Sequence, residues 1–404
     1  MDTGIYESST TSNRGIGMKR STDRILTTHA GSLPRPSGLR DVIKSYLDGE
    51  PYDESEMASQ VRSAVSEVVR QQADAGVDIV SDGEQSKTGF LLYGNDRLAG
   101  FELVQIQPDE RRRAPRRDEE AFPEFYAAYY QTEGDSGPKR QPLCTGPISY
   151  TGHALIQQDI QNFKSALNGV ATEEAFLPAI SPGTFGRGQN RYYQNEEAFL
   201  YAIADAIKEE YKAIVDAGFL LQIDDPGLPD TWDMQVPALS VAEYRKSAAI
   251  KIDALNHALA GIPEEKIRYH ICWGSWHGPH STDIPLKDIV DLVLRVNAGG
   301  YSIEAANPRH EHEWKLWEDV KLPDGKVLVP GVISHSTNHI EHPELVAQRI
   351  TNFAGLVGPE NVVAGTDCGF SQRALNPRLH PSIVWAKLQA LSEGARIASN
   401  QLFG

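Results

Sequence analysis

The chain has 404 residues, of which 40% are hydrophobic and 23% are charged. These values are those of an ordinary globular protein, and a single α/β barrel with insertions in its loops reaches this length. The formal net charge of -16 argues against nucleic acid as a partner, because an acidic protein repels a phosphate backbone. No run approaches the roughly 18 apolar residues of a membrane helix, so we expect no membrane partner either.

Three cysteines in so long a chain cannot form a disulfide framework, which favours a reducing, cytoplasmic location. The first residues include Ser and Thr where a secretory signal would have an apolar core. We therefore expect residues 1–22 to be a disordered leader and residues 23–404 to be one catalytic domain, with Met18 as an alternative start.

From residue 24 onward, short β-rich runs alternate with long amphipathic stretches, which is typical of a parallel sheet covered by helices. Eight strands are predicted, at 25–32, 78–84, 175–183, 219–226, 267–274, 301–307, 327–334 and 362–370. Helices are predicted at 56–75, 196–217, 241–260, 286–297, 343–356 and 381–399. Eight such units predict an α/β fold of the closed (β/α)8 TIM barrel type.

Two more strand-like runs, 101–106 and 142–150, lie on either side of a charged loop that contains proline. We interpret them as a β-hairpin inserted after the second strand, at about residues 100–150 and outside the barrel count. The loop contains a basic run at 111–117, followed directly by three carboxylates. A solvated loop is the expectation for this run, with a subunit contact or a site for an anionic substrate tail as alternatives.

Polar residues gather at the predicted C-terminal ends of the strands, where barrels of this kind carry their reacting groups. Residues two apart in a strand face the same side, so His270 and Cys272 should point together into the barrel mouth. Glu304 and Cys368 end two other strands. One imidazole, two thiolates and one carboxylate make a plausible tetrahedral zinc set. The residues alone leave a second interpretation open, in which the cysteines are small core residues and the histidine is a satisfied polar group.

The order of these residues resembles the zinc signature of the catalytic barrel of cobalamin-independent methionine synthases: His-x-Cys, then Glu about thirty residues later, then Asp-Cys-Gly about sixty further on. The resemblance covers about residues 24–404. It also includes four further motifs, which are Gly31-Ser32 with Pro34, Gly83-Glu84, Gln222-Ile223-Asp224 with Pro226, and Gly331-Val332.

The resemblance implies that His270, Cys272, Glu304 and Cys368 bind Zn²⁺, the one cofactor expected. It also implies that Gly31, Ser32, Glu84 and Asp224 hold the amino-acid part of a homocysteine-like thiol, since an ammonium group needs carboxylates around it. As an alternative, Asp224 caps the loop after its strand. Cys144 has no counterpart among the ligands and is interpreted as structural.

The implied enzyme is a zinc-dependent methyltransferase or alkyltransferase that acts on a small-molecule thiol with a small-molecule alkyl donor. A free thiol has a pKa near 8.5, and coordination to zinc deprotonates it at neutral pH. The leaving group of the donor needs a proton as its bond to carbon breaks. His335 is the first choice for this general acid, because the family tends to carry a histidine in that loop, and His339 is the second.

Two features depart from a full-length methionine synthase. The chain has one barrel where that enzyme has two, so a folate donor cannot be assumed, and the loops at 273–280 and 307–314 are unusually rich in Trp and His. The chain also resembles epoxyalkane:coenzyme M transferases, in which a thiol with a sulfonate opens an epoxide. Lys87, Arg187 and Arg191 could bind a sulfonate, whereas Glu84 and Asp224 favour homocysteine. A metal-free barrel lyase is the third alternative.

Overall fold

A closed barrel of eight parallel strands forms the centre of the computed structural model, which describes residues 18–105, 116–132, 140–187, 190–235, 237–375 and 377–404. The strands lie in the order β1-β10-β9-β8-β7-β6-β5-β2, and Thr28 at the end of β1 pairs with Ile79 of β2 to close the ring. They are β1 (Leu26–Thr27), β2 (Ile79–Ser81), β5 (Glu174–Ile180), β6 (Leu220–Asp224), β7 (Ile267–Ile271), β8 (Gly300–Glu304), β9 (Val327–Ile333) and β10 (Val363–Thr366). The predicted (β/α)8 barrel is confirmed, and most of its strands are shorter than predicted because their polar C-terminal ends form turns.

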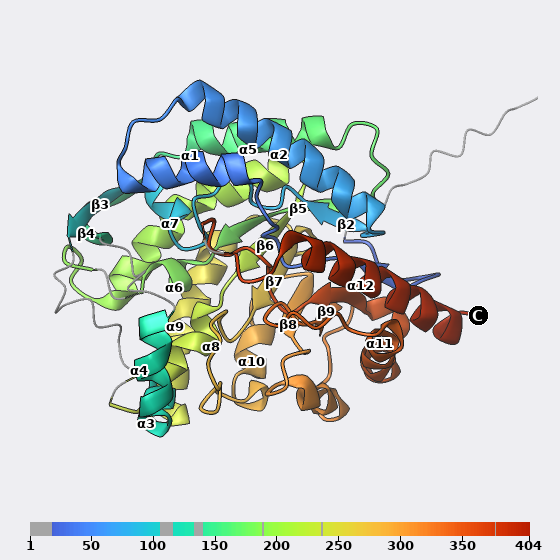
Figure 1. The fold of residues 1–404 in the computed structure, drawn as a ribbon. Coiled ribbons are helices and arrows are strands. Elements are labelled where there is room, and N and C mark those ends of the chain that lie inside the picture. The colour runs from blue at the N-terminus through green and yellow to red at the C-terminus, as the bar shows by residue number, and fades with distance from the viewer. Residues whose placement is uncertain (1–17, 106–115, 133–139, 188–189, 236, 376) are drawn as a thin grey trace, which may run out of the picture.

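Helices surround this barrel (Figure 1). They are α1 (Ser37–Asp48), α2 (Glu54–Asp74), α5 (His153–Ala166), α6 (Pro182–Phe185), α7 (Glu196–Asp216), α8 (Gly227–Asp233), α9 (Val241–Leu259), α10 (Val290–Leu294), α11 (Pro343–Val357) and α12 (Pro381–Leu402). Local signals set several helix starts: Asp53 caps α2, Asn195 caps α7, and Ser240 with Glu243 forms a capping box on α9.

The helix predicted at 286–297 is wrong in its extent. The structure has a short 3-10 turn, Leu286–Asp288, and then α10 as a separate helix of five residues. The backbone of Ile289, between them, has φ of -133°, which is outside the helical range, so the two segments cannot form one continuous helix.

The insertion after β2 contains two antiparallel strands, β3 (Leu98–Gln105) and β4 (Arg140–Tyr150). The segment that joins them carries two helices, α3 (Arg117–Ala121) and α4 (Pro123–Thr132), so it is not the simple loop we expected. Residues 111–115 of the basic run lie outside the described residues. At its end, the Arg116 guanidinium lies 3.7 Å from the ring centre of Trp276 and pairs with Asp230 at 2.9 Å. The expectation of a solvated loop is therefore wrong for Arg116.

The chain is packed against the barrel from Met18 onward. The amide of Met18 donates to the carbonyl of Glu265 at 3.1 Å, and the buried hydroxyl of Ser21 donates to Val362 at 2.6 Å. Residues 18–22 of the expected leader are therefore part of the folded domain, while residues 1–17 lie outside the described residues. None of the described helices is long and apolar enough to cross a bilayer.

The interior of the barrel is apolar at one end only. A cluster of seven buried aliphatic and aromatic side chains fills the end where the strands begin, and Met18 packs against it. Its members are Leu26, Ile79, Phe176, Leu220, Val327, Val329 and Val363. Outward-facing residues of the same strands belong to a second, larger core under the helices. Strand alternation thus leaves the C-terminal end of the interior for polar side chains.

Candidate active site

The site is built on three neighbouring strands whose inward residues lie side by side. In the parallel register, Asp224 of β6 pairs with His270 of β7, and His270 pairs with Ser302 of β8. Two residues before His270, the buried guanidinium of Arg268 donates to the hydroxyl of Thr28 and to the carbonyl of His29, at 2.8 Å each. Arg268 therefore connects the floor of the site to the turn that follows β1.

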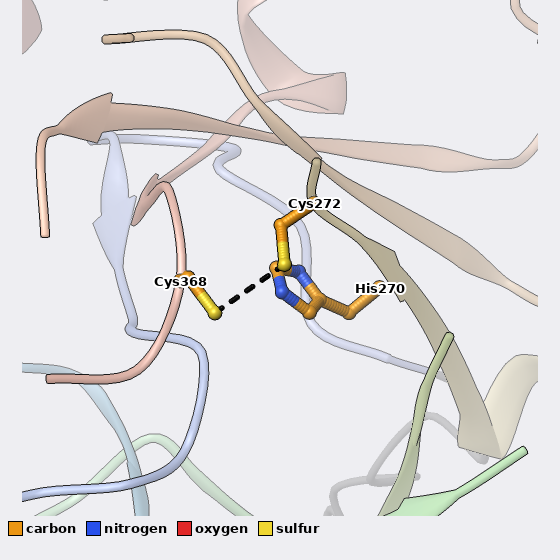
Figure 2. A group of neighbouring side chains, drawn as sticks. All are labelled: His270, Cys272 and Cys368. Atoms are coloured by element: carbon orange, nitrogen blue, oxygen red, sulfur yellow. Dashed lines mark hydrogen bonds between the residues drawn. The ribbon is translucent and has the colours of Figure 1, made fainter. Parts of the chain in front are cut away.

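Three of the four predicted metal ligands converge at this mouth (Figure 2). The ligand atoms of His270, Cys272 and Cys368 all lie within 4.8 Å of one another, and the two sulfur atoms are 3.5 Å apart. Nδ1 of His270 is 3.0 Å from the hydroxyl of Ser302, while Nε2 is buried and has no hydrogen-bond partner. An imidazole held by one nitrogen with the other free and facing two thiols is the arrangement of a metal-binding histidine.

The two thiols differ in pKa because one donates a hydrogen bond to the other. The hydrogen bond to Cys368, together with burial, raises the pKa of Cys272 well above its usual range. The same hydrogen bond and the contact with His270 hold the pKa of Cys368 well below its usual range, against the effect of burial.

The fourth predicted ligand lies in a neighbouring cluster. Glu304, His335 and Asp367 place their ligand atoms within 4.8 Å of one another. The Glu304 carboxylate accepts hydrogen bonds from the Trp273 amide at 2.8 Å and from the Asn307 side chain at 3.0 Å. The four predicted ligands therefore lie in two clusters. His270, Cys272 and Cys368 form one, and Glu304 belongs to the other, with its carboxylate hydrogen-bonded to the residue after Cys272.

His335 and His339, the two predicted general acids, have different environments. The ring of His335 is buried, and neither of its nitrogens has a hydrogen-bond partner. His339 is exposed, and its carbonyl accepts a hydrogen bond from Lys387. The geometry therefore places His335 within the site and His339 outside it.

Asp367 is a member of this cluster that the sequence reasoning missed as a functional residue, although it stands in the Asp-Cys-Gly motif. Its Oδ1 accepts from the amides of Ala305 and Ala306 at 2.7 Å each, and its Oδ2 is buried without a partner. Burial, and then the charge of Glu304, raises the pKa of Asp367 well above its usual range. Its place beside Cys368, a predicted metal ligand, was the available signal.

Two glycines allow these elements to approach closely. A Cβ on Gly331 of β9 would lie 2.6 Å from the backbone of Asp367, and a Cβ on Gly369 would lie 2.2 Å from the hydroxyl oxygen of Ser32. Any side chain at either position would displace the turn that carries Cys368. The Gly-Val motif on β9 therefore has a packing reason.

The residues expected to hold an amino acid gather on the other side of the mouth. Gly31 has φ of +126°, and a Cβ there would lie 2.7 Å from a carboxylate oxygen of Glu84. No hydrogen-bond donor of the described chain reaches that carboxylate. Asp224 accepts from Gln222 at 2.7 Å, and Ser32 accepts from the Ser371 amide at 3.2 Å. Burial, opposed by His270 and reinforced by Glu84, raises the pKa of Asp224 to about 7.

The three cations suggested for a sulfonate have separate environments. The buried ammonium of Lys87 donates to the carbonyl of Pro178 at 2.6 Å, and Arg187 pairs with Asp230 at 3.0 Å. Arg191 is exposed. Cys144 is buried in β4, where its thiol donates to Gly146 at 3.4 Å, as a structural cysteine would.

The comparisons with known proteins agree with this architecture. The family model "Cobalamin-independent synthase, Catalytic domain" matches residues 25–177 and 183–380. Methionine synthases of Sulfolobus acidocaldarius and Saccharolobus solfataricus are each 25% identical to the chain, over 93% of it and 93% and 95% of their own lengths. The B12-independent methionine synthase from Shewanella sp. W3-18-1, solved with selenomethionine, has the same fold, with a TM-score of 0.70 at 22% identity over 94% of this chain and 99% of that one. The chain belongs to the family of cobalamin-independent synthase catalytic domains.

Proposed function

We propose that the chain is a zinc-dependent methyltransferase whose acceptor is the thiol of homocysteine or a close analogue. The family and the methionine synthases among its relatives support methyl transfer as the reaction. The observation that carries the zinc assignment is the buried, unpartnered Nε2 of His270 facing two thiols.

The residues fit Zn²⁺ because zinc prefers thiolate and imidazole ligands in a four-coordinate set. His270, Cys272 and Cys368 would hold the ion, with Glu304 as the fourth ligand from the adjacent cluster. Bound zinc would supply the acidity that keeps an acceptor thiol deprotonated at neutral pH.

The chain's own residues bind and orient the acceptor. Its ammonium group would lie between the carboxylates of Glu84 and Asp224, both of which are buried. Ser32 would bind the acceptor carboxylate through its hydroxyl, which lies against Gly369 in the turn after Cys368. The amino acid would thus bridge from β6 to the thiols and place its sulfur at the centre of the mouth.

His335 would protonate the leaving group. As the acceptor sulfur forms its bond to the methyl carbon, the bond from that carbon to the donor atom breaks, and the donor atom takes a proton from His335. Burial lowers the pKa of His335, against the charges of Cys368 and Glu304, so the ring must take up a proton before it can act as the acid. Neither ring nitrogen is engaged in a hydrogen bond, so either can take up that proton and face the donor.

The other two candidate reactions have less support. A metal-free lyase does not explain why Nε2 of His270 is buried without a hydrogen-bond partner. An epoxide-opening transferase for a sulfonate-bearing thiol needs free cations at the mouth. Arg187 pairs with Asp230 through Nη1 only, and its buried Nε and Nη2 have no hydrogen-bond partner, which favours this alternative. Lys87, however, donates to the carbonyl of Pro178, and Arg191 is exposed.

The test is a methyl-transfer assay on zinc-loaded protein. Homocysteine and coenzyme M are compared as acceptors, with 5-methyltetrahydrofolate and methylcobalamin as donors, and the product is identified by mass spectrometry. We expect methionine as the product, and a His335→Asn variant should lose about 10²–10⁴ in kcat. His339→Asn is the matched control and should keep its rate. Alkylation of coenzyme M in preference to homocysteine, or an unchanged rate in His335→Asn, would refute the respective assignment.

A further inference from the structure

The two loops that are rich in Trp and His, at 273–280 and 307–314, are joined through a buried chain of charges that the proposed reaction does not use. Nδ1 of His280 lies 2.8 Å from Oδ2 of Asp283, and the same oxygen lies 3.1 Å from Nε2 of His310. Nδ1 of His310 is in turn 2.9 Å from Glu313. The side chains of His280, Asp283 and His310 are each less than a tenth exposed.

His310 must carry a proton on both ring nitrogens in this arrangement. Each nitrogen faces a carboxylate oxygen, and an ionised carboxylate only accepts hydrogen bonds. His280 is in the same position, because its second nitrogen lies 3.2 Å from the carbonyl of Trp276. Two buried imidazolium rings therefore share Asp283 between them.

Each of these rings stacks on a tryptophan. His310 lies 3.8 Å from Trp273, with the ring planes at 20°, and His280 lies 3.8 Å from Trp276, at 29°. Trp273 is fully buried, and its indole N–H donates to Ile284 at 2.8 Å. The position of Trp273 is thus fixed on one face by a cation and at its edge by a hydrogen bond.

Trp273 directly follows the ligand Cys272, and its amide donates to Glu304. The other oxygen of Glu304 accepts from Asn307, whose own carbonyl accepts from the His310 amide at 2.8 Å. Both hydrogen bonds that orient the Glu304 carboxylate therefore depend on residues that His310 contacts.

We propose that His310 and Asp283 are positioning residues that fix the carboxylate of Glu304 for metal binding. His310 acts through the stacked Trp273 and through Asn307, and Asp283 acts by keeping His310 in place. The inference rests on the proposed function only in taking Glu304 as a metal ligand.

The first measurement is zinc affinity, by competition with a chromophoric chelator. His310→Gln and Asp283→Asn should each weaken zinc binding by about 10–100-fold, the usual effect of losing a residue that orients a metal ligand. The absorption spectrum of the cobalt-substituted protein should change in the same variants. His312→Gln is the matched control, since His312 is exposed in the 3-10 segment Glu311–Glu318, which begins directly after His310, and the change should leave both readouts unaltered.

A double-mutant cycle separates positioning from a general loss of structure. In a Glu304→Gln background, adding His310→Gln should change the zinc dissociation constant by no more than about twofold, because the group through which it acts is gone. Losses that multiply fully in the double variant would overturn the inference, since they would show that His310 acts elsewhere.

Two further observations keep the inference testable if His310→Gln does not fold. The cycle can be repeated with Asp283→Asn, which keeps the size of the side chain and removes only its charge. In the wild-type protein, nitrogen NMR of the histidine rings should show both nitrogens of His310 protonated at pH 8. A neutral His310 ring would overturn the inference. Wild-type protein that passes these tests but transfers no methyl group would refute the proposed function alone.

Discussion

The two ends of the barrel interior are made by the same strands but differ in chemistry. In β6, Leu220 lies in the apolar cluster at one end, and Asp224, four residues later, lies in the candidate active site. The apolar end gains free energy from burial, whereas the other end buries histidines, carboxylates and thiols, which costs free energy unless each finds a partner. In β6, therefore, the first half of the strand stabilises the fold and the second half carries the candidate chemistry.

The largest expected effect separates metal binding from folding. Cys272→Ser should reduce the zinc content of purified protein to well below one per chain and abolish methyl transfer. Cys144→Ser is the control, because Cys144 is equally buried but lies in β4, outside the ligand cluster, and it should keep full zinc content. Metal analysis by mass spectrometry checks both variants, and equal zinc in the two would remove the metal assignment.

A substitution at the apolar end of the barrel interior should change the stability of the fold and leave zinc binding intact. Phe176 is fully buried there, with the Arg268 guanidinium 4.0 Å from its ring centre. Phe176→Ala should lower the free energy of unfolding by about 3–5 kcal/mol through the cavity it leaves. Denaturant titration measures this loss. The folded variant should still bind one zinc, and loss of zinc from folded protein would show that the two ends are not separable.

The charged network at the mouth should stabilise the protein only while it is protonated. Burial lowers the pKa of His310, but its bonds to Asp283 and Glu313 outweigh this and raise the pKa to about 9, from an ordinary value of 6.5. The folded pKa is the higher one, so the contribution is complete below about pH 6.5 and is lost as pH rises through about 9. A shift of this size corresponds to about 3 kcal/mol.

This sign can be checked by comparing wild-type protein with His310→Gln. The difference between their free energies of unfolding should be largest near pH 6 and should shrink toward pH 10. A difference that stays constant, or grows with pH, would mean that His310 is neutral in the folded protein.

The smallest effect tests how closely the two polar clusters approach. Gly331→Ala would place a methyl group 2.6 Å from the Asp367 backbone and should cost about 1–3 kcal/mol, with weaker zinc binding as the turn of Cys368 shifts. Gly355→Ala in α11 is the control, since nothing lies within 4 Å of the added methyl group, and it should stabilise by about 0.5–1 kcal/mol. Equal effects of the two changes would contradict the close approach.

Much of the fold could be predicted from local pattern. The β-rich runs identified all eight strands, because burial on both faces of a parallel strand leaves a clear apolar signal. The helical runs identified five of the twelve α-helices that the structure describes, namely α2, α7, α9, α11 and α12. The helix at 286–297 was wrong because Ile289 breaks a run that reads as continuous. The insertion was misread because α3 has a charged sequence that reads as a loop, and because α3 and α4 are held by contacts with the loop after β7, such as those of Asp118 with Ser281 and of Tyr126 with Trp276.

The sequence by itself predicted that His270 and Cys272 lie together at the barrel mouth, since alternation along one strand needs no knowledge of the rest of the chain. The order of motifs then added Glu304 and Cys368. Only the tertiary structure decided that Glu304 lies with His335 and Asp367, and that Asp283 joins two distant loops. These arrangements depend on contacts between residues 27 to 62 positions apart, such as Asp283 with His310 and Ala305 with Asp367, and local pattern contains no record of such contacts.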